Sequence, residues 1–329
     1  MSALFWIAIF LISLGVMIKG ADWFLASSER IGVALRISPF IIGVTIVAMG
    51  TSLPELVSSL FAVARGAGDV VVANAVGSNI ANIFLVIGLS ATLGKKLLIN
   101  KNLIDLDIPL LAITTSIFFF MIKDGSVLLG ESIVLLVSFA IYLLYTILHH
   151  DEPHESEVLQ EHLDIAEKKH ALEPLAKITP KVRGYDIVLL ILGGIGLILG
   201  AKFLIDAVIA LSEIYQVGTG VIAVSAIALG TSLPELIVSV RAAMQGKSAI
   251  AIGNIFGSNI FNMLMVVGIP GLLGTLPVDP QTLTLALPFM IVSTILFMLS
   301  GISRRIYNWE GIFFLVLYVI FLGQLFGFL

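Results

Sequence analysis

Two copies of one heptapeptide, GTSLPEL, carry the side chains best suited to binding a metal cation. They occupy Gly50–Leu56 and Gly230–Leu236. Each proline stands inside an apolar run, where it cannot donate a hydrogen bond to the carbonyl four residues back, and so frees that carbonyl. The hydroxyls and carboxylates nearby are those of Thr51, Ser52, Glu55, Thr231, Ser232 and Glu235. These hard oxygen ligands suit Ca²⁺ and Na⁺ and suit soft transition metals poorly.

The hydroxyls have a second explanation, because Ser and Thr beside a transmembrane proline often re-satisfy freed backbone groups. That explanation does not extend to Glu55 and Glu235. A carboxylate near the bilayer centre is costly and functional by default. Two of them occur here at equivalent positions, and the nearest basic residues, Arg65 and Arg241, stand toward the loops. We therefore expect both glutamates to be functional.

A second motif also occurs twice, as GSNIAN at Gly77–Asn82 and as GSNIFN at Gly257–Asn262. Spacings of four place polar residues on one helical face in each copy: Asn74, Ser78 and Asn82, and then Asn254, Ser258 and Asn262. We expect Ser78, Asn82, Ser258 and Asn262 to line the site. Asn79 and Asn259 lie off that face and are expected to join helices, as amides commonly do in membranes.

The composition identifies a membrane protein. Of 329 residues, 58% are hydrophobic and 12% charged, with a mean hydropathy of +1.09, whereas soluble domains carry roughly twice that charged fraction. The 18 basic and 22 acidic residues argue against nucleic-acid binding, and the absence of cysteine excludes disulfides and thiolate sites. All five histidines lie between residues 149 and 183.

The apolar runs predict an all-α polytopic membrane protein with ten transmembrane helices as two inverted five-helix repeats, since each span needs about 20 residues. The first apolar run lacks the flanks of a cleaved signal peptide and is taken as a retained helix. The predicted spans are 3–25, 38–64, 70–93, 105–122, 128–148, 185–212, 219–244, 249–273, 282–300 and 307–328.

Basic residues orient these spans. With both termini outside, fourteen Lys and Arg residues fall in inner loops and only Arg65 and Lys123 in outer ones, which is the bias expected of cytoplasmic loops. Both motifs recur at an offset of 180 residues without a gap. Five spans separate equivalent helices, so the second half enters the membrane inverted, as in many secondary transporters. We expect repeats at 1–148 and 185–329, joined by a charged cytoplasmic linker at 149–184.

The remaining charges within spans form two pairs with helical spacing, Lys19 with Asp22 and Lys202 with Asp206. Each pair is expected to neutralise locally. The linker combines five histidines with eight acidic residues. It could bind metal or regulate activity, although such mixed-charge segments are usually only solvated.

The paired GTSLPEL and GSNI-x-N motifs resemble the repeats of the sodium/calcium exchanger family, and the ten-span layout with a short central loop resembles its compact prokaryotic members. The resemblance implies exchange of Na⁺ for Ca²⁺ across the plasma membrane by alternating access, in which the first and sixth spans slide past a rigid core. It assigns the ligands to Glu55, Glu235, Thr51, Ser52, Thr231, Ser232, Ser78, Asn82, Ser258 and Asn262, with the carbonyls of Ala48 and Ala228. Many exchangers have Asp at the place of Asn262, which leaves the stoichiometry and the involvement of potassium open.

These observations lead to a secondary-active Na⁺/Ca²⁺ antiporter that is not an enzyme and uses no cofactor. Its partners are inorganic cations and the lipid bilayer, and it is expected to function as a monomer. A proton- or potassium-coupled cation exchanger is the nearest alternative, and a cation channel is a more distant one. An intramembrane hydrolase is remote, because the motif hydroxyls have no histidine or lysine base within their spans.

Overall fold

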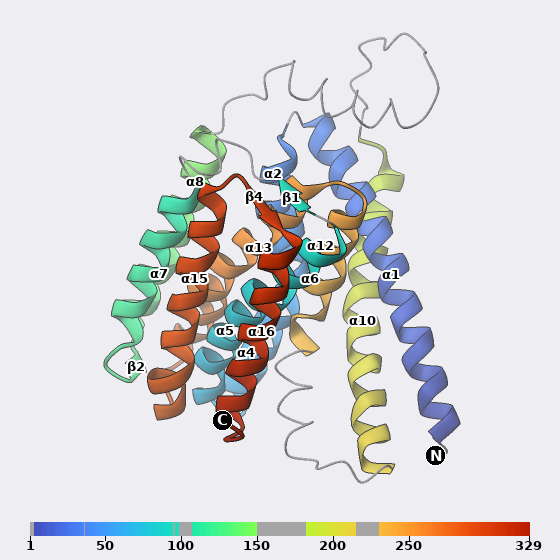
Figure 1. Ribbon diagram of the computed structural model, residues 1–329. Coiled ribbons are helices and arrows are strands. Elements are labelled where there is room, and N and C mark those ends of the chain that lie inside the picture. Colours follow the sequence, from blue (N-terminus) through green and yellow to red (C-terminus); the bar gives the residue numbers. More distant parts are fainter. Residues whose placement is uncertain (1–2, 36, 95, 99–106, 150–181, 215–229) are drawn as a thin grey trace, which may run out of the picture.

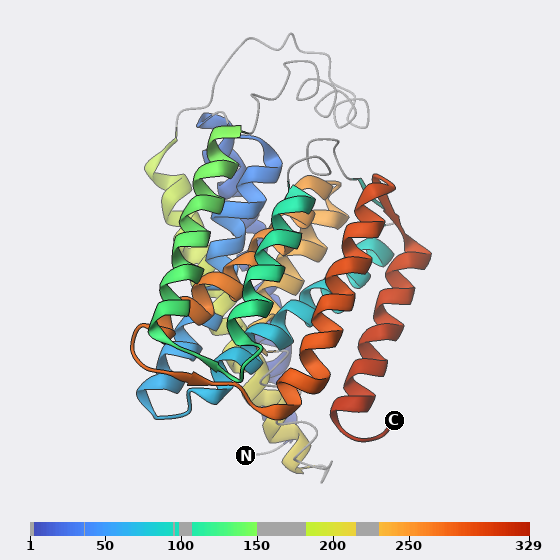
Figure 2. The ribbon, with the colours of Figure 1, turned by 90° about the vertical axis from the view of Figure 1, so that its left-hand side faces the viewer.

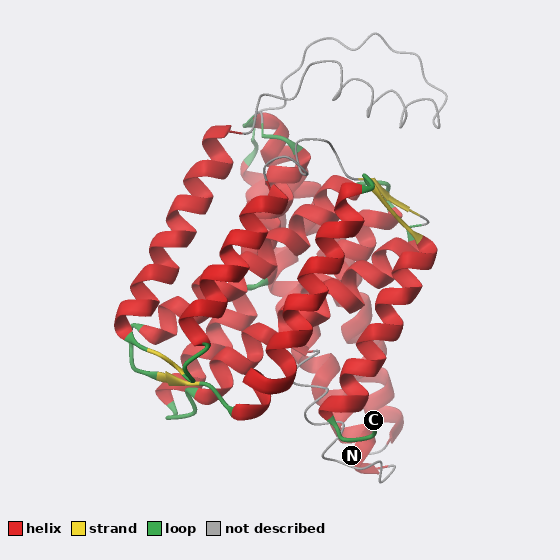
Figure 3. Cartoon of the chain, turned by 60° about the vertical axis from the view of Figure 1, so that its left-hand side comes forward, coloured by secondary structure: helices red, strands yellow, loops and turns green. Residues whose placement is uncertain are grey.

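The computed structural model describes residues 3–35, 37–94, 96–98, 107–149, 182–214 and 230–329. These parts are helical apart from two short strand pairs. Strand β1 (Lys96–Leu98) pairs antiparallel with β4 (Arg305–Tyr307), and β2 (Ser126–Val127) pairs antiparallel with β3 (Leu276–Pro277). Figure 3 shows the two strand pairs at opposite ends of the helix bundle.

Eight helical stretches among the described residues are long and apolar enough to cross a membrane. Shorter segments make up some of these stretches, because π-helical turns and a proline break subdivide them. The elements are α1 (Ala3–Ala34); α2 (Pro39–Ile42), η1 (Gly43–Val47), α3 (Ala48–Thr51) and α4 (Leu53–Ala64); α5 (Asp69–Ile80), η2 (Ala81–Ile87) and α6 (Gly88–Leu93); α8 (Leu129–His149); α10 (Gly184–Ile214); α13 (Ser248–Phe261), η4 (Asn262–Val266) and α14 (Val267–Gly271); η5 (Thr282–Ala286) and α15 (Leu287–Ile302); and α16 (Asn308–Leu325). Two shorter helices, α7 (Ile108–Ile122) and α12 (Leu233–Met244), complete the described bundle.

Helix α1 is longer than the predicted span 3–25, since it continues to Ala34. The polar residues Glu29 and Arg30 are compatible with a loop, but both have charged partners elsewhere in the fold: Lys247 in the turn after α12, and Asp186 on α10. Without an interrupting proline before Pro39, nothing in the local sequence ends the helix sooner. The predicted linker, residues 149–184, lies almost entirely outside the described residues.

Helices α1 and α10 lie side by side at one edge of the bundle (Figure 1). Their glycines allow backbone to meet backbone: a Cβ atom on Gly20 would stand 2.9 Å from the carbonyl oxygen of Gly193, and one on Gly193 would stand 2.8 Å from that of Gly20. Gly200 similarly faces the backbone of Ser13. Such close approach, which small residues permit in membranes, makes α1 and α10 a closely packed pair.

Helix α13 runs through the middle of the molecule, and every one of its residues from Ile250 to Phe261 is buried. It packs against α2 and η1: a Cβ atom on Gly253 would lie 2.5 Å from the carbonyl oxygen of Phe40 in α2 and 3.1 Å from the backbone nitrogen of Val44 in η1. Helices α8, α7, α15 and α16 form a row on another side (Figure 2). Their outward side chains, such as Val137, Phe120 and Val316, are large, apolar and exposed. A lipid-facing surface has this character.

The turns that follow the two motif helices have the same geometry. Gly66 and Gly246 both adopt positive φ, 76° and 80°. The next residue in each turn donates to the carbonyl five residues back, Ala67 to Ala62 and Lys247 to Ala242, both at 2.9 Å. This is the Schellman closure, which requires a left-handed residue and favours glycine. The 180-residue offset therefore extends to local backbone conformation.

Candidate functional site

The heptapeptides interrupt their helices at the same position. Ser52 and Ser232 have nearly equal backbone angles, −89° and 5° against −84° and 3°, and a new helix begins at the next residue, with Pro54 or Pro234 in its first turn. Proline fits there because the first turn has no intrahelical acceptor for its missing N–H. Each break places a glutamate in the first turn of the helix that resumes. The predicted proline breaks are therefore present in the structure.

Glu235 is fully buried and lies against hydroxyls from both halves of the chain. Ser52 Oγ donates to its Oε1 at 2.7 Å, and Ser258 Oγ stands 3.5 Å from the same oxygen. The two hydroxyl oxygens lie 2.9 Å apart. Oε2 of Glu235 accepts no hydrogen bond from the described residues. One carboxylate oxygen is thus held by serines, and the other is left for a further partner.

Glu55 is also fully buried, but neither of its oxygens accepts a hydrogen bond within the described part of the chain. Ser52 of its own heptapeptide donates to Glu235 at 2.7 Å, so both glutamates belong to the region where the two helix breaks meet. A buried carboxylate without a counter-charge or donors is strongly destabilising. Two buried carboxylates in one region, with three oxygens that accept no hydrogen bond from the described residues, make a site suited to a cation.

Threonines and asparagines connect the two halves around this centre. Thr51 Oγ1 donates to Asn254 Oδ1 at 3.1 Å, and the equivalent pair, Thr231 with Asn74, is separated by 3.5 Å. Asn254 also donates to Ser239 Oγ at 2.8 Å. Each motif threonine therefore meets the polar face of the other half, which spacing within one helix could not reveal.

The polar side chains of the second motif are buried in the same region. Ser258 reaches Glu235, as expected for a helix facing the glutamate of its own half. Ser78 Oγ has no partner among the described residues. Asn82 and Asn262 donate their amide N–H groups across the halves, to Asn259 and Asn79, each at 3.2 Å. All four expected lining residues lie in the buried interior.

The role expected for Asn79 and Asn259 is incomplete. They do join helices, but their partners are the two asparagines expected to line the site. A helical-face argument considers one helix at a time and so places them off the polar row. One feature of the sequence points to this role: asparagine occupies the third position in both copies of the motif, although the fifth position differs, Ala81 against Phe261.

The carbonyl oxygen of Ala48 is buried and already accepts from the backbone N–H of Ser52 at 3.0 Å and from Thr51 Oγ1 at 3.3 Å. If this carbonyl oxygen binds an ion, it does so in addition to accepting these two hydrogen bonds. Ala228 lies outside the described residues. The assignment of both carbonyls stays a prediction.

Comparison with known proteins identifies the family. The family model for the sodium/calcium exchanger protein matches residues 5–148 and 185–327. The chain belongs to the sodium/calcium exchanger family. The paired motifs had predicted this family, and the prediction is confirmed; its members are membrane transporters rather than enzymes.

Relatives resemble this exchanger-family chain over nearly its whole length. The sodium/calcium exchanger MaX1 of Methanosarcina acetivorans is 32% identical over 345 residues, covering 97% of each chain. An uncharacterized membrane protein of Methanocaldococcus jannaschii is 34% identical over 321 residues, covering 96% of each. A solved structure of the sodium-calcium exchanger NCX_Mj has a TM-score of 0.81 at 31% identity, covering 98% of this chain and 100% of that one. The all-helical, multi-pass membrane fold is therefore established.

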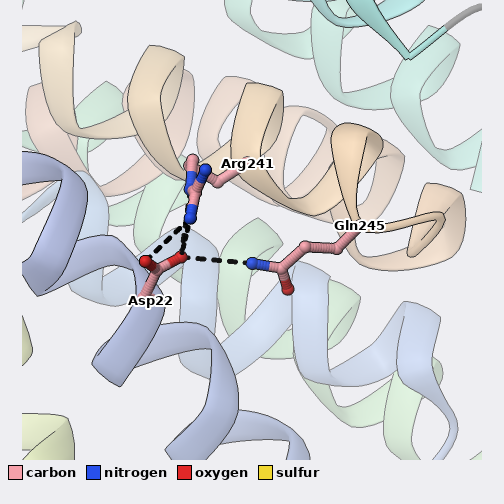
Figure 4. Close-up of polar contacts among 3 residues, drawn as sticks. All are labelled: Asp22, Arg241 and Gln245. Atoms are coloured by element: carbon pink, nitrogen blue, oxygen red, sulfur yellow. Dashed lines mark hydrogen bonds and ion pairs between the residues drawn. The ribbon is translucent and has the colours of Figure 1, made fainter.

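One expectation about the charges of this exchanger is wrong. Asp22 is not paired with Lys19: among the described residues it binds Arg241 of α12, with Arg Nη2 2.6 and 2.7 Å from its two oxygens (Figure 4). Lys19 instead lies over the ring of Trp23, 5.7 Å from its centroid. No ion pair links Lys202 to Asp206 either, both of which the structure describes, and Lys202 lies over Phe203. Sequence spacing identified helical neighbours but could not show that another helix offers Asp22 a bidentate partner, which is stronger.

Proposed function

We propose that this protein is a secondary-active antiporter that exchanges Na⁺ for Ca²⁺ across the plasma membrane by alternating access. One observation carries the proposal: Glu55 and Glu235 are fully buried at breaks that meet through Ser52, and three of their four oxygens accept no hydrogen bond from the described residues. A carboxylate pair at the centre of a membrane protein needs cations. The relatives named as sodium/calcium exchangers support Na⁺ and Ca²⁺ as those cations.

The proposed ligands are oxygens throughout. Two carboxylates, four motif hydroxyls, and the side chains of the second motif surround the ions, with backbone carbonyls completing the set: Glu55, Glu235, Thr51, Ser52, Thr231, Ser232, Ser78, Asn82, Ser258, Asn262, Ala48 and Ala228. Flexible oxygen coordination of this kind suits Ca²⁺. Two negative charges balance one Ca²⁺, and Asn262 adds none. Sodium ions then compete for the same carboxylates, which is what couples the two fluxes.

The proposed architecture is ten spans in two inverted repeats, at 1–148 and 185–329, with 149–184 as a cytoplasmic linker and both termini outside. In support, the start of α1 and the end of α16 lie at the same end of the bundle (Figure 1). The fourteen-to-two distribution of basic residues supports the orientation. The family model matches two separate segments whose limits agree with the proposed repeats. In this scheme the close-packed α1 and α10 pair moves against the remaining helices.

The experiment is uptake of ⁴⁵Ca²⁺ into proteoliposomes loaded with sodium, with sodium, potassium and proton gradients imposed separately. Uptake that requires internal sodium, saturates with Ca²⁺ and persists without a pH gradient is expected. Uptake driven by the proton gradient alone would mean that protons, and not sodium, are the coupling ion. Uptake that depends on potassium would mean that potassium takes part in the coupling. Rapid flux without any counter-ion would indicate a channel and contradict the proposal.

A further inference from the structure

Four buried asparagines form a crossed arrangement between the two halves. Asn82 Nδ2 donates to Asn259 Oδ1 at 3.2 Å, and Asn262 Nδ2 donates to Asn79 Oδ1 at 3.2 Å. The 180-residue offset exchanges Asn79 with Asn259 and Asn82 with Asn262, so the two hydrogen bonds are equivalent. None of the four side chains exceeds 2% exposure.

These bonds determine which end of each amide is left over. An asparagine side chain has one carbonyl oxygen and one NH₂ group. Because the NH₂ groups of Asn82 and Asn262 are engaged, their carbonyl oxygens point elsewhere, and neither oxygen accepts a hydrogen bond from the described residues. A buried polar atom without a partner is uncommon and calls for an explanation. Here both unpartnered atoms are oxygens, the ligand type that Ca²⁺ and Na⁺ prefer.

We propose that Asn79 and Asn259 are positioning residues, which hold the amides of Asn262 and Asn82 so that their carbonyl oxygens face the transported ion. The proposal rests on the proposed function. A free amide can rotate by half a turn and present its NH₂ group, whose positive end repels a cation. Accepting a hydrogen bond from that NH₂ group prevents the rotation. Each positioning residue belongs to the opposite half from the ligand it holds, so the clamp also links the two halves at the site.

The two arms of this clamp are not anchored equally. Asn79 Nδ2 donates to the backbone carbonyl of Asn259 at 3.1 Å, so both ends of its amide are engaged. Asn259 Nδ2 has no partner among the described residues. The amide of Asn79 is therefore fixed on its own account, and that of Asn259 is fixed mainly by Asn82. We expect substitution of Asn79 to disturb the site more than substitution of Asn259.

The test is a double-mutant cycle on Ca²⁺-dependent exchange in proteoliposomes. Asn79→Ala is expected to raise the KM for Ca²⁺ about five- to tenfold, the effect of losing one buried hydrogen bond, with a smaller change in maximal rate. In an Asn262→Ala background it should raise KM no further, because the amide it holds is gone. The same non-additivity is expected for Asn259→Ala with Asn82→Ala. The crossed combination, Asn79→Ala with Asn82→Ala, should be additive and serves as the control.

A role in packing alone would reduce thermal stability without ions and add to the effect of Asn262→Ala on KM, and that result would overturn the clamp. If Asn79→Ala is not recovered folded, Asn79→Ser replaces it, and the cycle of Asn259→Ala with Asn82→Ala tests the same proposal. Failure of the proposed ligand set is distinguishable. In that case Asn262→Ala and Asn82→Ala alone would leave the KM for Ca²⁺ unchanged.

A second inference comes from a different observation, the ion pairs that join α1 to the end of α12 and to the turn that follows it. Arg241 binds Asp22 through both carboxylate oxygens, and Gln245 Nε2 donates to Asp22 at 3.2 Å (Figure 4). Further along, Lys247 Nζ contacts Glu29 at 2.6 Å. Asp22 and Glu29 are two helical turns apart and so share a face of α1. This cluster tethers the α1 and α10 pair to the remainder of the protein.

Among the described residues, the equivalent positions of the other half carry no matching ion pair. The positions 180 residues away are Lys202 and Ile209 on α10, and Phe61, Arg65 and Ala67 at the end of α4. The equivalent contact would place the positively charged Lys202 opposite the apolar ring of Phe61 and the positive charge of Arg65. No ion pair is available from these residue types.

We infer that the Asp22–Arg241 and Glu29–Lys247 cluster is a one-sided latch, which favours the conformation with α1 held on α12 over its counterpart in the transport cycle. This inference also rests on alternating access. Movement of α1 and α10 against the other helices must break these pairs, whereas the residues at the equivalent positions of α10 and α4 offer no such pair. Because the side chains of Asp22 and Arg241 are 29% and 32% exposed, the latch biases the equilibrium modestly and does not lock it.

The latch can be tested without transport, because the chain has no cysteine of its own. Ser28→Cys places a thiol at a fully buried position of α1, which lies between Asp22 and Glu29 along the helix. Labelling of purified protein by a hydrophilic maleimide, without Na⁺ or Ca²⁺, is expected to accelerate about three- to fivefold on Arg241→Gln. The charge swap Asp22→Arg with Arg241→Asp should restore slow labelling.

Arg30→Gln is the matched control, because Arg30 pairs with Asp186 inside the α1 and α10 pair. It should leave the labelling rate unchanged. An unchanged rate in Arg241→Gln, or an equal rise in Arg30→Gln, would overturn the latch. Since no ion is present, the outcome does not depend on which ions are exchanged.

Discussion

Glu55 and Glu235 occupy equivalent positions of identical heptapeptides, yet the two halves of the molecule surround them differently. Ser52 and Ser258 converge on Glu235, and one of them donates to it at 2.7 Å. The hydroxyls of their equivalents, Ser232 and Ser78, have no hydrogen-bond partner among the described residues, and neither do the carboxylate oxygens of Glu55. One glutamate is thus held in place, while the other is left with its neighbouring hydroxyls free.

The same inequality is found where α1 meets the end of α12 and the turn that follows it. That contact carries two ion pairs, and the residues at the equivalent place in the other half cannot form any. In contrast, the α1 and α10 contact is nearly equal on both sides, with Gly20 against Gly193 and Gly200 against Ser13. The contact between α1 and α10 is therefore similar in the two halves, whereas the contacts that attach this pair to the remaining helices differ.

This difference teaches that identical motifs do not impose identical environments. A transporter of two inverted repeats alternates by exchanging the conformations of its halves. In either of its two states the halves must then differ, even where their sequences agree. The unequal hydrogen bonding of Glu55 and Glu235 is what such a protein requires in a single state.

The largest effect is expected from the glutamates themselves. Glu55→Gln and Glu235→Gln should each reduce Ca²⁺ exchange to the background of empty vesicles, because each removes a charged ligand from a divalent, dehydrated ion. ⁴⁵Ca²⁺ uptake measures this directly. Glu131→Gln is the control, since Glu131 binds the backbone N–H of Leu128 at an exposed helix start. Near-normal exchange in either site variant would break the functional equivalence of the two halves.

The next effect concerns the symmetric contact. Gly20→Ala and Gly200→Ala should destabilise the protein similarly, by about 1–3 kcal/mol, because the new methyl group would stand 2.9 Å or 3.1 Å from a backbone oxygen of the partner helix. Gly196→Ala should be tolerated, since its nearest neighbour would lie at 3.6 Å. Thermal unfolding in detergent distinguishes them. A large loss for one site alone would show that the α1 and α10 contact is not equal on its two sides.

Much of this arrangement could be predicted from sequence, because it depends on local chemistry. Proline inside an apolar run breaks a helix, and a repeated break locates the carboxylates. What could not be predicted depends on contacts between segments about 180 residues apart. Asn79 holds Asn262, and Thr51 reaches Asn254, because the halves interlock. Asp22 was assigned to Lys19 for the same reason: spacing along one helix says nothing about Arg241.

A smaller effect should separate the serines of the two heptapeptides. Ser52→Ala removes the only short hydrogen bond to Glu235 within the described residues and should destabilise the ion-free protein by about 1–3 kcal/mol. Ser232→Ala removes a hydroxyl that has no partner there, so its effect on ion-free stability should be close to zero. Thermal unfolding without Na⁺ and Ca²⁺ provides the measurement. Equal losses would mean that the inequality of the halves is absent in solution.

The smallest effect is expected from the segment that connects the halves. Replacing residues 155–173 by a short flexible spacer removes six of the linker's eight acidic residues and two of its five histidines, but neither motif. The halves are joined by the glycine contacts of α1 with α10 and by α13 against η1, where a Cβ atom on Gly257 would lie 2.3 Å from the Val44 carbonyl oxygen. Backbone contact of this closeness holds the halves in register without a covalent link. The deletion should therefore retain ⁴⁵Ca²⁺ exchange within about twofold of the parent at equal expression, since surface changes away from buried features usually have small effects. Loss of exchange in a well-expressed deletion would show that the linker takes part in transport, and that the comparison of the halves must include the segment between them.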